Sequence, residues 1–205
     1  MIILGAGGHA RELYNEFIWS GIQPPNYFYD DSGNAPATLL DQIVLDSLDS
    51  ARNLNSAIQQ FVVGVGNPLI RKKLYDLFSN AGFEPFSLIS IQARVGINNE
   101  LGRGLNVMTG AVITTNVCIG DGTLVHINSS IHHDCKIGSF CEISPGSRIL
   151  GKVTLGNLVS IGSGAIILPG IRIGDNVKVG AGAVVTRDLE NNEVVVGIPA
   201  KPIKK

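Results

Sequence analysis

Apolar residues recur at every sixth position through the second half of the chain. Counting in steps of six from Val95, all sixteen positions as far as Val185 hold valine, isoleucine or leucine. Strands alternate with a period of two and helices repeat every ~3.6 residues, so neither explains a strict period of six. The pattern predicts a chain that turns a corner every six residues. Glycines that ease the bends follow eight of these positions directly: Gly96, Gly102, Gly120, Gly138, Gly156, Gly162, Gly174 and Gly180.

Three such sides close a triangular coil of eighteen residues, with the aliphatic side chains stacked in columns inside. The repeat therefore predicts a parallel β-helix of about five coils, from residue 95 to about residue 187. The period alone does not fix the hand of the coil. Cys135 and Cys141 fall four residues after an aliphatic, so we interpret them as core residues. Small residues dominate this inward position and indicate a narrow interior: Ala111, Thr123, Ser129, Cys135, Cys141, Ser147, Ala165 and Ala183.

The first 87 residues follow a different pattern, in which short apolar strands alternate with helices. MIIL, YFYDD and FVVGVG predict strands, and NPLIRKKLYDLFSNAG predicts a helix with Asn67 as N-cap, Pro68 at its first position and Gly82 at its end. Strands alternating with helices predict a small α/β domain with a parallel sheet over residues 1–87, ahead of the β-helix domain over 88–205. After the turn GAGGHA, one helix face carries Ala10, Leu13, Tyr14, Phe17 and Ile18.

Composition narrows the class of protein. The 205 residues include 16 basic and 17 acidic side chains without long runs of either sign, which argues against a nucleic-acid partner. The start lacks a basic leader with a cleavage site, and no apolar run is long enough to cross a membrane. Three cysteines without CxxC spacing suit reduced thiols, so we expect a cytoplasmic protein.

The turn GAGGHA lies between a predicted strand and a predicted helix. Its Gly7 and Gly8 leave backbone N–H groups bare at the helix start, where a diphosphate binds well. Asp30 and Asp31 follow about twenty residues later, at the position of a ribose-binding acid. In this interpretation His9 either contacts the ligand or merely caps the turn. The alternative is a tight turn in an α/β sheet with its acids in solvent.

Residues eighteen apart lie one coil apart in the same column. His133 therefore stacks between Thr115 and Gly151, about 4.8 Å from each along the axis. Acyl transfer needs a base for the nucleophile and an N–H group aimed at the developing oxyanion. A neutral imidazole beside a glycine supplies both, since histidine has a reference pKa of about 6.5.

Two other interpretations of the histidines remain open. His126, His132 and His133 are possible ligands of a catalytic zinc ion, as in β-helical carbonic anhydrases. The six-residue spacing of His126 and His132 places them on different sides of the coil and argues against this site. Exposed histidines also decorate repeat proteins without function, and for His132 alone we prefer that explanation.

Longer motifs point to one family. HHDCKIG, EISPGSRILGKVTLG, IGSGAIILPGIRIG, VGAGAVVTRDL and VGIPAKPI resemble the hexapeptide-repeat sugar acetyltransferases of the sialic acid O-acetyltransferase family. This family includes N-acetyltransferases of nucleotide-linked 4-amino-4,6-dideoxy sugars. GAGGHA, YDD and VGVGNPLIRKKLY are similar to its nucleotide-sugar domain. The resemblance implies a Rossmann-like domain followed by a left-handed β-helix.

The resemblance also implies roles for individual residues. His133 matches the general base, Asp134 the acid that orients it, and Gly151 the N–H that contacts the thioester carbonyl. Neighbouring side chains on a strand point apart, so the His133–Asp134 pair requires the geometry of a corner. His126 and Glu142 depart from the asparagine and histidine of many relatives, which leaves the acceptor open. The implied sugar-nucleotide contacts are Gly7, Gly8, His9, Asp30, Asp31 and His126, and the implied coenzyme A contacts are Glu142, Gly151, Ala181, Gly182, Gly197, Ile198, Pro199 and Lys201.

The resemblance thus implies acetyl transfer from acetyl-CoA to the 4-amino group of a nucleotide-linked sugar, by direct attack, in surface glycan biosynthesis. It also implies a homotrimer with active sites between subunits, and we expect no metal. The main alternative is O-acetylation of a sugar such as sialic acid. A non-catalytic nucleotide-binding scaffold and a nicotinamide-dependent oxidoreductase built on GAGGHA are further alternatives, although about 87 residues make a short version of the latter fold.

Overall fold

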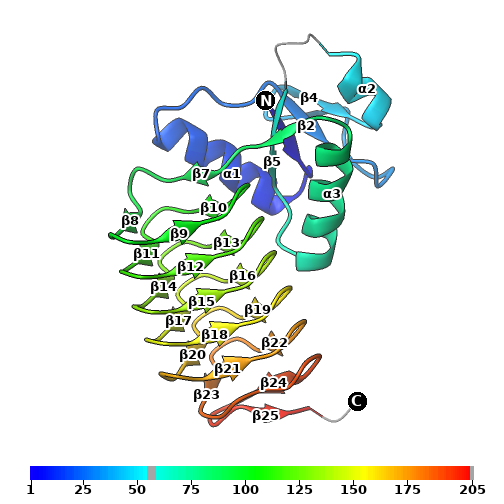
Figure 1. Ribbon diagram of the computed structural model, residues 1–205. Helices are drawn as coiled ribbons and strands as arrows, with labels where there is room; N and C mark the ends of the chain where they lie inside the picture. The colour runs from blue at the N-terminus through cyan, green and yellow to red at the C-terminus, as the bar shows by residue number, and fades with distance from the viewer. Residues whose placement is uncertain (55–58, 204–205) are drawn as a thin grey trace.

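The computed structural model describes residues 1–54 and 59–203 (Figure 1). Its N-terminal domain holds a six-stranded sheet in the order β3-β4-β2-β1-β5-β6, parallel except for the antiparallel β3–β4 pair. The predicted strands and helices are confirmed, while β3, β4, α2 and β6 occupy segments for which no element was predicted. The elements are β1 (Ile2–Leu4), α1 (Gly8–Trp19), β2 (Tyr27–Tyr29), β3 (Thr38–Leu39), β4 (Gln42–Leu45), α2 (Leu48–Arg52), β5 (Gln60–Val63), α3 (Pro68–Asn80) and β6 (Glu84–Pro85).

The two faces of this sheet pack into separate cores. Alternate residues of a strand point to opposite faces, so Ile2 and Leu4 join the core beneath α2 and α3, whereas Ile3 joins the core beneath α1. The predicted cap of α3 is present, because the Asn67 Oδ1 accepts hydrogen bonds from the N–H groups of Leu69 and Ile70 at 3.0 and 3.2 Å.

The apolar stripe predicted on α1 is only partly correct. Ala10, Leu13 and Phe17 are fully buried, but Ile18 is 53% exposed. The fully buried Glu16 lies next to Phe17 instead. Its carboxylate accepts hydrogen bonds from Thr109, in the second domain, at 2.8–3.2 Å. A polar contact between domains therefore replaces part of the expected apolar face.

The second domain is a β-helix with three faces, and each face is a sheet of mainly parallel strands (Figure 1). The first face contains β7 (Leu88–Ile89), β10 (Asn106–Val107), β13 (Leu124–Val125), β16 (Glu142–Ile143), β19 (Ser160–Ile161), β22 (Lys178–Val179), β24 (Val194–Val196) and the antiparallel β25 (Lys201–Pro202). The second contains β8 (Arg94–Val95), β11 (Val112–Ile113), β14 (Ser130–Ile131), β17 (Arg148–Ile149), β20 (Ile166–Ile167) and β23 (Val184–Val185). The third contains β9 (Glu100–Leu101), β12 (Cys118–Ile119), β15 (Lys136–Ile137), β18 (Thr154–Leu155) and β21 (Arg172–Ile173).

The register confirms the coil of eighteen residues. Val107 pairs with Val125, and Val125 with Ile143, along the first face. The aliphatic columns fill the interior, and Cys135 and Cys141 are buried there as predicted. The β-helix is longer than the predicted span of residues 95 to 187, because β7 precedes Val95 and because β24 and β25 follow residue 187. The last complete turn is shortened, because Val179 pairs with Val195 only sixteen residues later.

The N-terminal domain covers the upper coils of the first face. Leu88, Met108 and Leu124 on that face share a core with Ile3 and Phe17 of the N-terminal domain. The Asn106 side chain donates a hydrogen bond to the Val63 carbonyl at 2.7 Å. Both apolar and polar contacts therefore join β5 and α1 to the β-helix. In the described part of the chain, no helix has the length and apolar character that crossing a bilayer requires.

Candidate active site

His133 and Asp134 occupy the corner between β14 on the second face and β15 on the third. Asp134 has φ +61, in the left-handed region, and this turn brings its side chain back to its neighbour. The His133 Nδ1 lies 2.8 Å from the Asp134 Oδ2. A carboxylate only accepts hydrogen bonds, so Nδ1 carries the proton and Nε2 is the free acceptor. The corner geometry that this pair requires is thus present.

Asn116 is a further support that the sequence motif did not indicate. Its side-chain amide donates a hydrogen bond to the Asp134 Oδ1 at 3.3 Å, from the coil above. Hydrogen bonds from His133 and then Asn116 lower the pKa of Asp134, which keeps its carboxylate charged. Asn116 lies eighteen residues before Asp134, so the coil period offered a signal for it.

Gly151 lies directly below His133, one coil further along. The backbone confirms the predicted stacking, because Asp134 N–H donates to the Thr115 carbonyl at 3.1 Å and Lys152 N–H donates to the His133 carbonyl at 2.9 Å. A Cβ on Gly151 would lie 2.6 Å from both Nε2 and Cε1 of His133. Among the described residues, the Gly151 N–H takes part in no backbone hydrogen bond. The free acceptor of the imidazole therefore lies beside an available N–H group.

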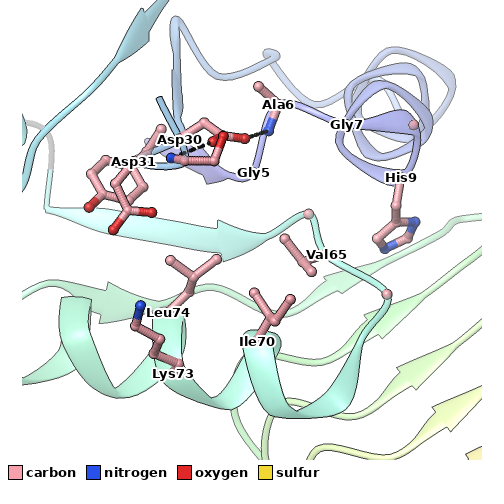
Figure 2. A pocket seen from close by; sticks show the side chains of 15 residues that line it. Gly5, Ala6, Gly7, His9, Asp30, Asp31, Val65, Ile70, Lys73 and Leu74 are labelled. Carbon is pink, nitrogen blue, oxygen red and sulfur yellow. Dashed lines mark hydrogen bonds between the residues drawn. The ribbon is translucent and has the colours of Figure 1, made fainter. Parts of the chain in front are cut away.

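A cavity of about 360 Å³ opens at the carboxyl ends of β1, β2 and β5 (Figure 2). Gly7 is the N-cap of α1 and has no side chain that could accept hydrogen bonds from the first N–H groups of the helix. Gly7 and Gly8 line the cavity, so these N–H groups are available to a ligand there. A Cβ on Gly7 or Gly8 would meet nothing within 4 Å, which leaves room for a ligand. Gly5 is required by the turn itself, since it has φ +110 and a Cβ there would lie 2.7 Å from Val65.

The two acids after β2 differ in their surroundings. Asp30 accepts hydrogen bonds from the N–H groups of Ala6 and Ser32, at 3.1 and 3.0 Å, and so holds the glycine turn (Figure 2). Asp31 also lines the cavity. Burial, followed by the charge of Asp31, raises the pKa of Tyr29 to about 12, so the phenol remains a hydrogen-bond donor.

His9 and His126 come from different domains and meet at the junction. His9 is on α1 and lines the cavity, and His126 directly follows β13 on the first face. Their ring centroids are 5.2 Å apart. Glu12, which the sequence analysis missed, lies between them, with its Oε2 3.2 Å from the His9 Nδ1 and 3.6 Å from the His126 Nε2. Its signal was the three-residue spacing from His9 on a helix.

The histidines proposed as zinc ligands do not meet within one chain. His132 and His133 follow β14, away from His126 on the first face, and the His132 Nε2 is 3.5 Å from the Ser130 hydroxyl. In the described residues, the cluster with metal-like spacing is His9, Glu12 and His126, whose ligand atoms lie within 4.8 Å of one another. The His126 Nδ1 accepts a hydrogen bond from the Ile127 N–H at 3.1 Å, which puts the imidazole proton on Nε2 and disfavours a metal there.

Glu142 lines a second cavity, of about 300 Å³, between the start of α3 and the first face. Burial raises the pKa of Glu142, and the charge of the fully buried Arg71 opposes this effect. Burial lowers the pKa of Arg71 to about 10, so it stays charged near neutral pH, and its Nη2 donates to the Gly66 carbonyl at 3.1 Å. Arg71 thus links this cavity to the loop that borders the first one.

Only part of the predicted coenzyme A set comes together in a single chain. The segment 197–201 lies at the corner of Ala181 and Gly182, because the Val184 N–H donates to the Gly197 carbonyl at 3.1 Å. Gly151 lies at the corner between the second and third faces, whereas Glu142 is on the first face. Ala181 and Gly182 follow β22 at the corner between the first and second faces, and the segment 197–201 follows β24. His133 is likewise separated from the nucleotide cavity, because the N-terminal domain packs on the first face.

Two known families match this sequence. Residues 1–78 match the PglD N-terminal domain, and residues 119–151 and 152–187 match the bacterial transferase hexapeptide (six repeats). Among curated proteins, the GDP-perosamine N-acetyltransferase of Escherichia coli O157:H7 is 31% identical over 93 residues. That region is 45% of this chain and 42% of the relative, so the match spans less than half of either protein.

Solved structures resemble the chain over almost its whole length. The acetyltransferase domain of PglB from Neisseria gonorrhoeae FA1090 is 30% identical with a TM-score of 0.91, and 98% of each chain is covered. PerB from Caulobacter crescentus, solved in complex with CoA and GDP-perosamine, is 31% identical with a TM-score of 0.90, covering 99% of this chain and 96% of its own. This protein therefore belongs to the hexapeptide-repeat sugar acetyltransferases, with a Rossmann-like N-terminal domain and a left-handed β-helix, in the group that includes the N-acetyltransferases of nucleotide-linked 4-amino-4,6-dideoxy sugars.

Proposed function

We propose that this protein transfers the acetyl group of acetyl-CoA to the 4-amino group of a nucleotide-linked 4-amino-4,6-dideoxy sugar, a step in surface glycan biosynthesis. One observation carries the proposal: the free Nε2 of His133, held by Asp134, lies beside Gly151 and its available N–H. A general base next to an oxyanion donor suits attack on a thioester. The relatives with CoA, acetyl-CoA and GDP-perosamine support the same chemistry.

In this mechanism the sugar amine attacks the thioester carbonyl directly. The new C–N bond forms as His133 Nε2 takes a proton from the amine, and the Gly151 N–H stabilises the oxyanion. The C–S bond then breaks and the coenzyme A thiolate leaves, with the proton on His133 available to it. Burial raises the pKa of Cys135, and that of Cys141 to about 12, so neither thiol suits an acyl-enzyme route.

The nucleotide binds in the N-terminal cavity. The diphosphate lies against Gly7 and Gly8 at the start of α1, where uncapped N–H groups favour an anion. Asp31 contacts the ribose, and Asp30 positions the turn through Ala6. The sugar extends past His9 toward His126, which lie at the junction of the two domains.

The complete active site forms between subunits of a homotrimer. The coenzyme A residues Glu142, Gly151, Ala181 and Gly182 and the segment Gly197, Ile198, Pro199 and Lys201 are spread over different faces and corners of one chain. A neighbouring copy brings its His133 corner to the first face of the other subunit, next to the sugar. A closed ring of identical heterologous interfaces repeats this site three times.

An acceptor screen tests the activity. The release of coenzyme A thiol from acetyl-CoA is measured with UDP-, dTDP- and GDP-linked 4-amino-4,6-dideoxy sugars and with free sialic acid. We expect turnover with one nucleotide sugar and a loss of 10²-fold or more, on the order of a missing general base, in His133→Ala. His132→Ala, at the neighbouring position, is the matched control and keeps its activity. Reaction with sialic acid alone would identify an O-acetyltransferase, and silence with every acceptor would contradict the proposal.

Mixing two inactive variants tests the intersubunit site. His133→Ala removes the base, and Gly8→Phe fills the nucleotide cavity. Coexpression should restore about a quarter of the wild-type activity, because about one interface in four combines an intact cavity with an intact base. If each site lay within one chain, the mixture would be as inactive as either variant.

A further inference from the structure

Glu12 joins the nucleotide cavity to the β-helix. It lies on α1, one helical turn beyond Gly8, or about 6 Å at about 1.5 Å per residue. Its Oε2 is within 3.2 Å of the His9 Nδ1 and 3.6 Å of the His126 Nε2. The side chain is 49% exposed, whereas the two histidine side chains are only 10% and 11% exposed. The carboxylate is thus the accessible member of a cluster whose other two members are buried.

Hydrogen bonding fixes where the protons of this cluster lie. The carboxylate only accepts, so the His9 proton is on Nδ1 and points to Glu12. The His126 Nδ1 accepts from the Ile127 N–H, so its proton is on Nε2 and also faces Glu12. The His9 N–H donates to the Glu12 Oε2 at 3.2 Å, and the His126 Nε2 lies 3.6 Å from the same oxygen. In the described part of the chain, the Glu12 Oε1 makes no hydrogen bond and remains available.

The cluster carries a net negative charge. Burial lowers the pKa of His9, and burial lowers that of His126 to about 4, with Arg71 acting in the same direction on both. The hydrogen bond from His9 lowers the pKa of Glu12. Near neutral pH both histidines are therefore uncharged while Glu12 is ionised, so neither histidine neutralises its charge.

We propose that the free Oε1 of Glu12 binds the ammonium group of the acceptor sugar and thereby selects an amino sugar over its hydroxyl counterpart. The inference rests on the proposed function and adds the feature that recognises the acceptor. A diphosphate at the start of α1 places the sugar along the first turn of that helix, within reach of Glu12. Primary amines are mostly protonated near neutral pH, so a carboxylate binds them by a charge-assisted hydrogen bond.

The position also suits the next step. Bound at Glu12, the amine lies at the first face, which the His133 of the same chain does not reach. One proton of the ammonium first leaves to solvent, which frees the lone pair of the nitrogen. As the amine then attacks, the His133 of a second copy takes another proton and makes it available to the leaving thiolate, as the proposed intersubunit site requires. Glu12 is thus a binding residue for the acceptor, and His9 and His126 hold its carboxylate in place.

Binding measurements with matched ligands test the role of Glu12. Calorimetry compares amino sugars with counterparts that carry a hydroxyl in place of the amine. The pairs are GDP-perosamine with GDP-D-rhamnose, dTDP-4-amino-4,6-dideoxyglucose with dTDP-6-deoxyglucose, and a UDP-linked 4-amino-4,6-dideoxy sugar with its 4-hydroxyl counterpart. The wild type should bind one amino sugar about tenfold more tightly than its hydroxyl counterpart, as one charge-assisted contact provides. Glu12→Gln keeps the shape and an acceptor for the histidines but removes the charge, so it should bind both sugars equally. Arg11→Gln, an exposed neighbour on the same helix, is the control and should keep the preference.

The outcomes separate this inference from the proposed function. If the wild type shows no amine preference, or if Glu12→Gln retains it, the role of Glu12 is overturned even when the acceptor screen detects N-acetylation. If Glu12→Gln weakens binding of the amino sugar, the hydroxyl sugar and the free GDP, dTDP or UDP equally, the role of Glu12 is merely structural and the inference is also overturned. A preserved amine preference without acetyl transfer would instead refute the proposed reaction.

Discussion

The imidazole of His133 occupies the space in which a side chain on Gly151 would begin. Both Nε2 and Cε1 lie 2.6 Å from the position of a Cβ on Gly151, a distance at which real Cβ atoms do not pack. The His133 ring therefore fits against the backbone of the residue eighteen positions later only because that residue, Gly151, has no side chain. The contact keeps the free Nε2 next to the Gly151 N–H.

Gly151→Ala should consequently disable catalysis without unfolding the protein. The added methyl group pushes the imidazole away from the N–H, and a displaced general base costs about 10²-fold or more in kcat. Steady-state kinetics with the identified acceptor measure this loss, and thermal unfolding should be nearly unchanged. A Gly151→Ala enzyme with wild-type kcat would show that the stacked geometry is not used in the reaction.

Asp134→Asn removes the charge of the carboxylate while it keeps the backbone turn, so it tests the charge alone. Asparagine tolerates the left-handed conformation at φ +61, so the corner is kept. The amide no longer enforces the Nδ1–H tautomer of His133, and we expect kcat to fall by about 10- to 100-fold while KM for acetyl-CoA changes little. Asp134→Ala should be worse, because it also loses the side chain that Asn116 supports. Equal activity of wild type and Asp134→Asn would rule out an orienting role.

The pattern of apolar residues predicted more of the catalytic corner than of the substrate junction. The six-residue phase places His133, Thr115 and Gly151 in one column because the coils around them are all eighteen residues long. Counting eighteen residues back from Asp134 leads to Asn116, and counting six residues back from Val95 leads to β7. Neither was predicted. Asn116 is a polar residue at a corner, outside the columns of apolar residues, and β7 belongs to a first coil that is partly exposed.

The meeting of His9, Glu12 and His126 had no comparable signal. It depends on how α1 lies against the first face, which the packing of side chains such as Phe17, Met108 and Leu124 decides. Burial of Glu16, with Ile18 exposed, follows from the same docking, and a periodic stripe on an isolated helix cannot reveal it.

His126 should make the protein sensitive to mild acid. Burial, followed by His9 with Arg71, lowers its pKa to about 4, although nearby Glu12 opposes the shift. Above the ordinary pKa of about 6.5 the residue is neutral in both states and contributes nothing. Between pH 6.5 and 4 the unfolded chain binds a proton that the folded chain does not, so the unfolding free energy falls by roughly 2 to 3 kcal/mol.

His126→Asn removes this titration. Urea unfolding at several pH values should show a shallower loss of stability between pH 6.5 and 4 than in the wild type, with the remaining slope due to His9 and other groups. The two proteins should differ little in that slope above pH 7, where neither histidine binds a proton. A wild-type slope in His126→Asn would mean that His126 titrates normally in the folded state.

Thr109→Val tests the polar contact that joins the domains. The hydroxyl of Thr109 lies 2.9 and 2.8 Å from the two carboxylate oxygens of Glu16, which is fully buried. Removing this donor leaves a buried acceptor unpaired, so we expect the unfolding free energy to fall by about 1–3 kcal/mol. Urea denaturation measures the loss, while thiol release from acetyl-CoA should continue under native conditions because neither residue touches the proposed active site.

A double-mutant cycle separates the pair from its surroundings. Glu16→Leu alone should also destabilise the protein, because the Thr109 N–H loses its acceptor and the Thr109 hydroxyl keeps only the Ser90 hydroxyl, 3.3 Å away, as a partner. Glu16→Leu combined with Thr109→Val replaces both partners by apolar groups, so it should recover part of the loss and give a coupling of about 1 kcal/mol or more. Strictly additive effects would show that Thr109 does not stabilise the buried carboxylate, and that the Asn106–Val63 contact and the shared apolar core hold the two domains together.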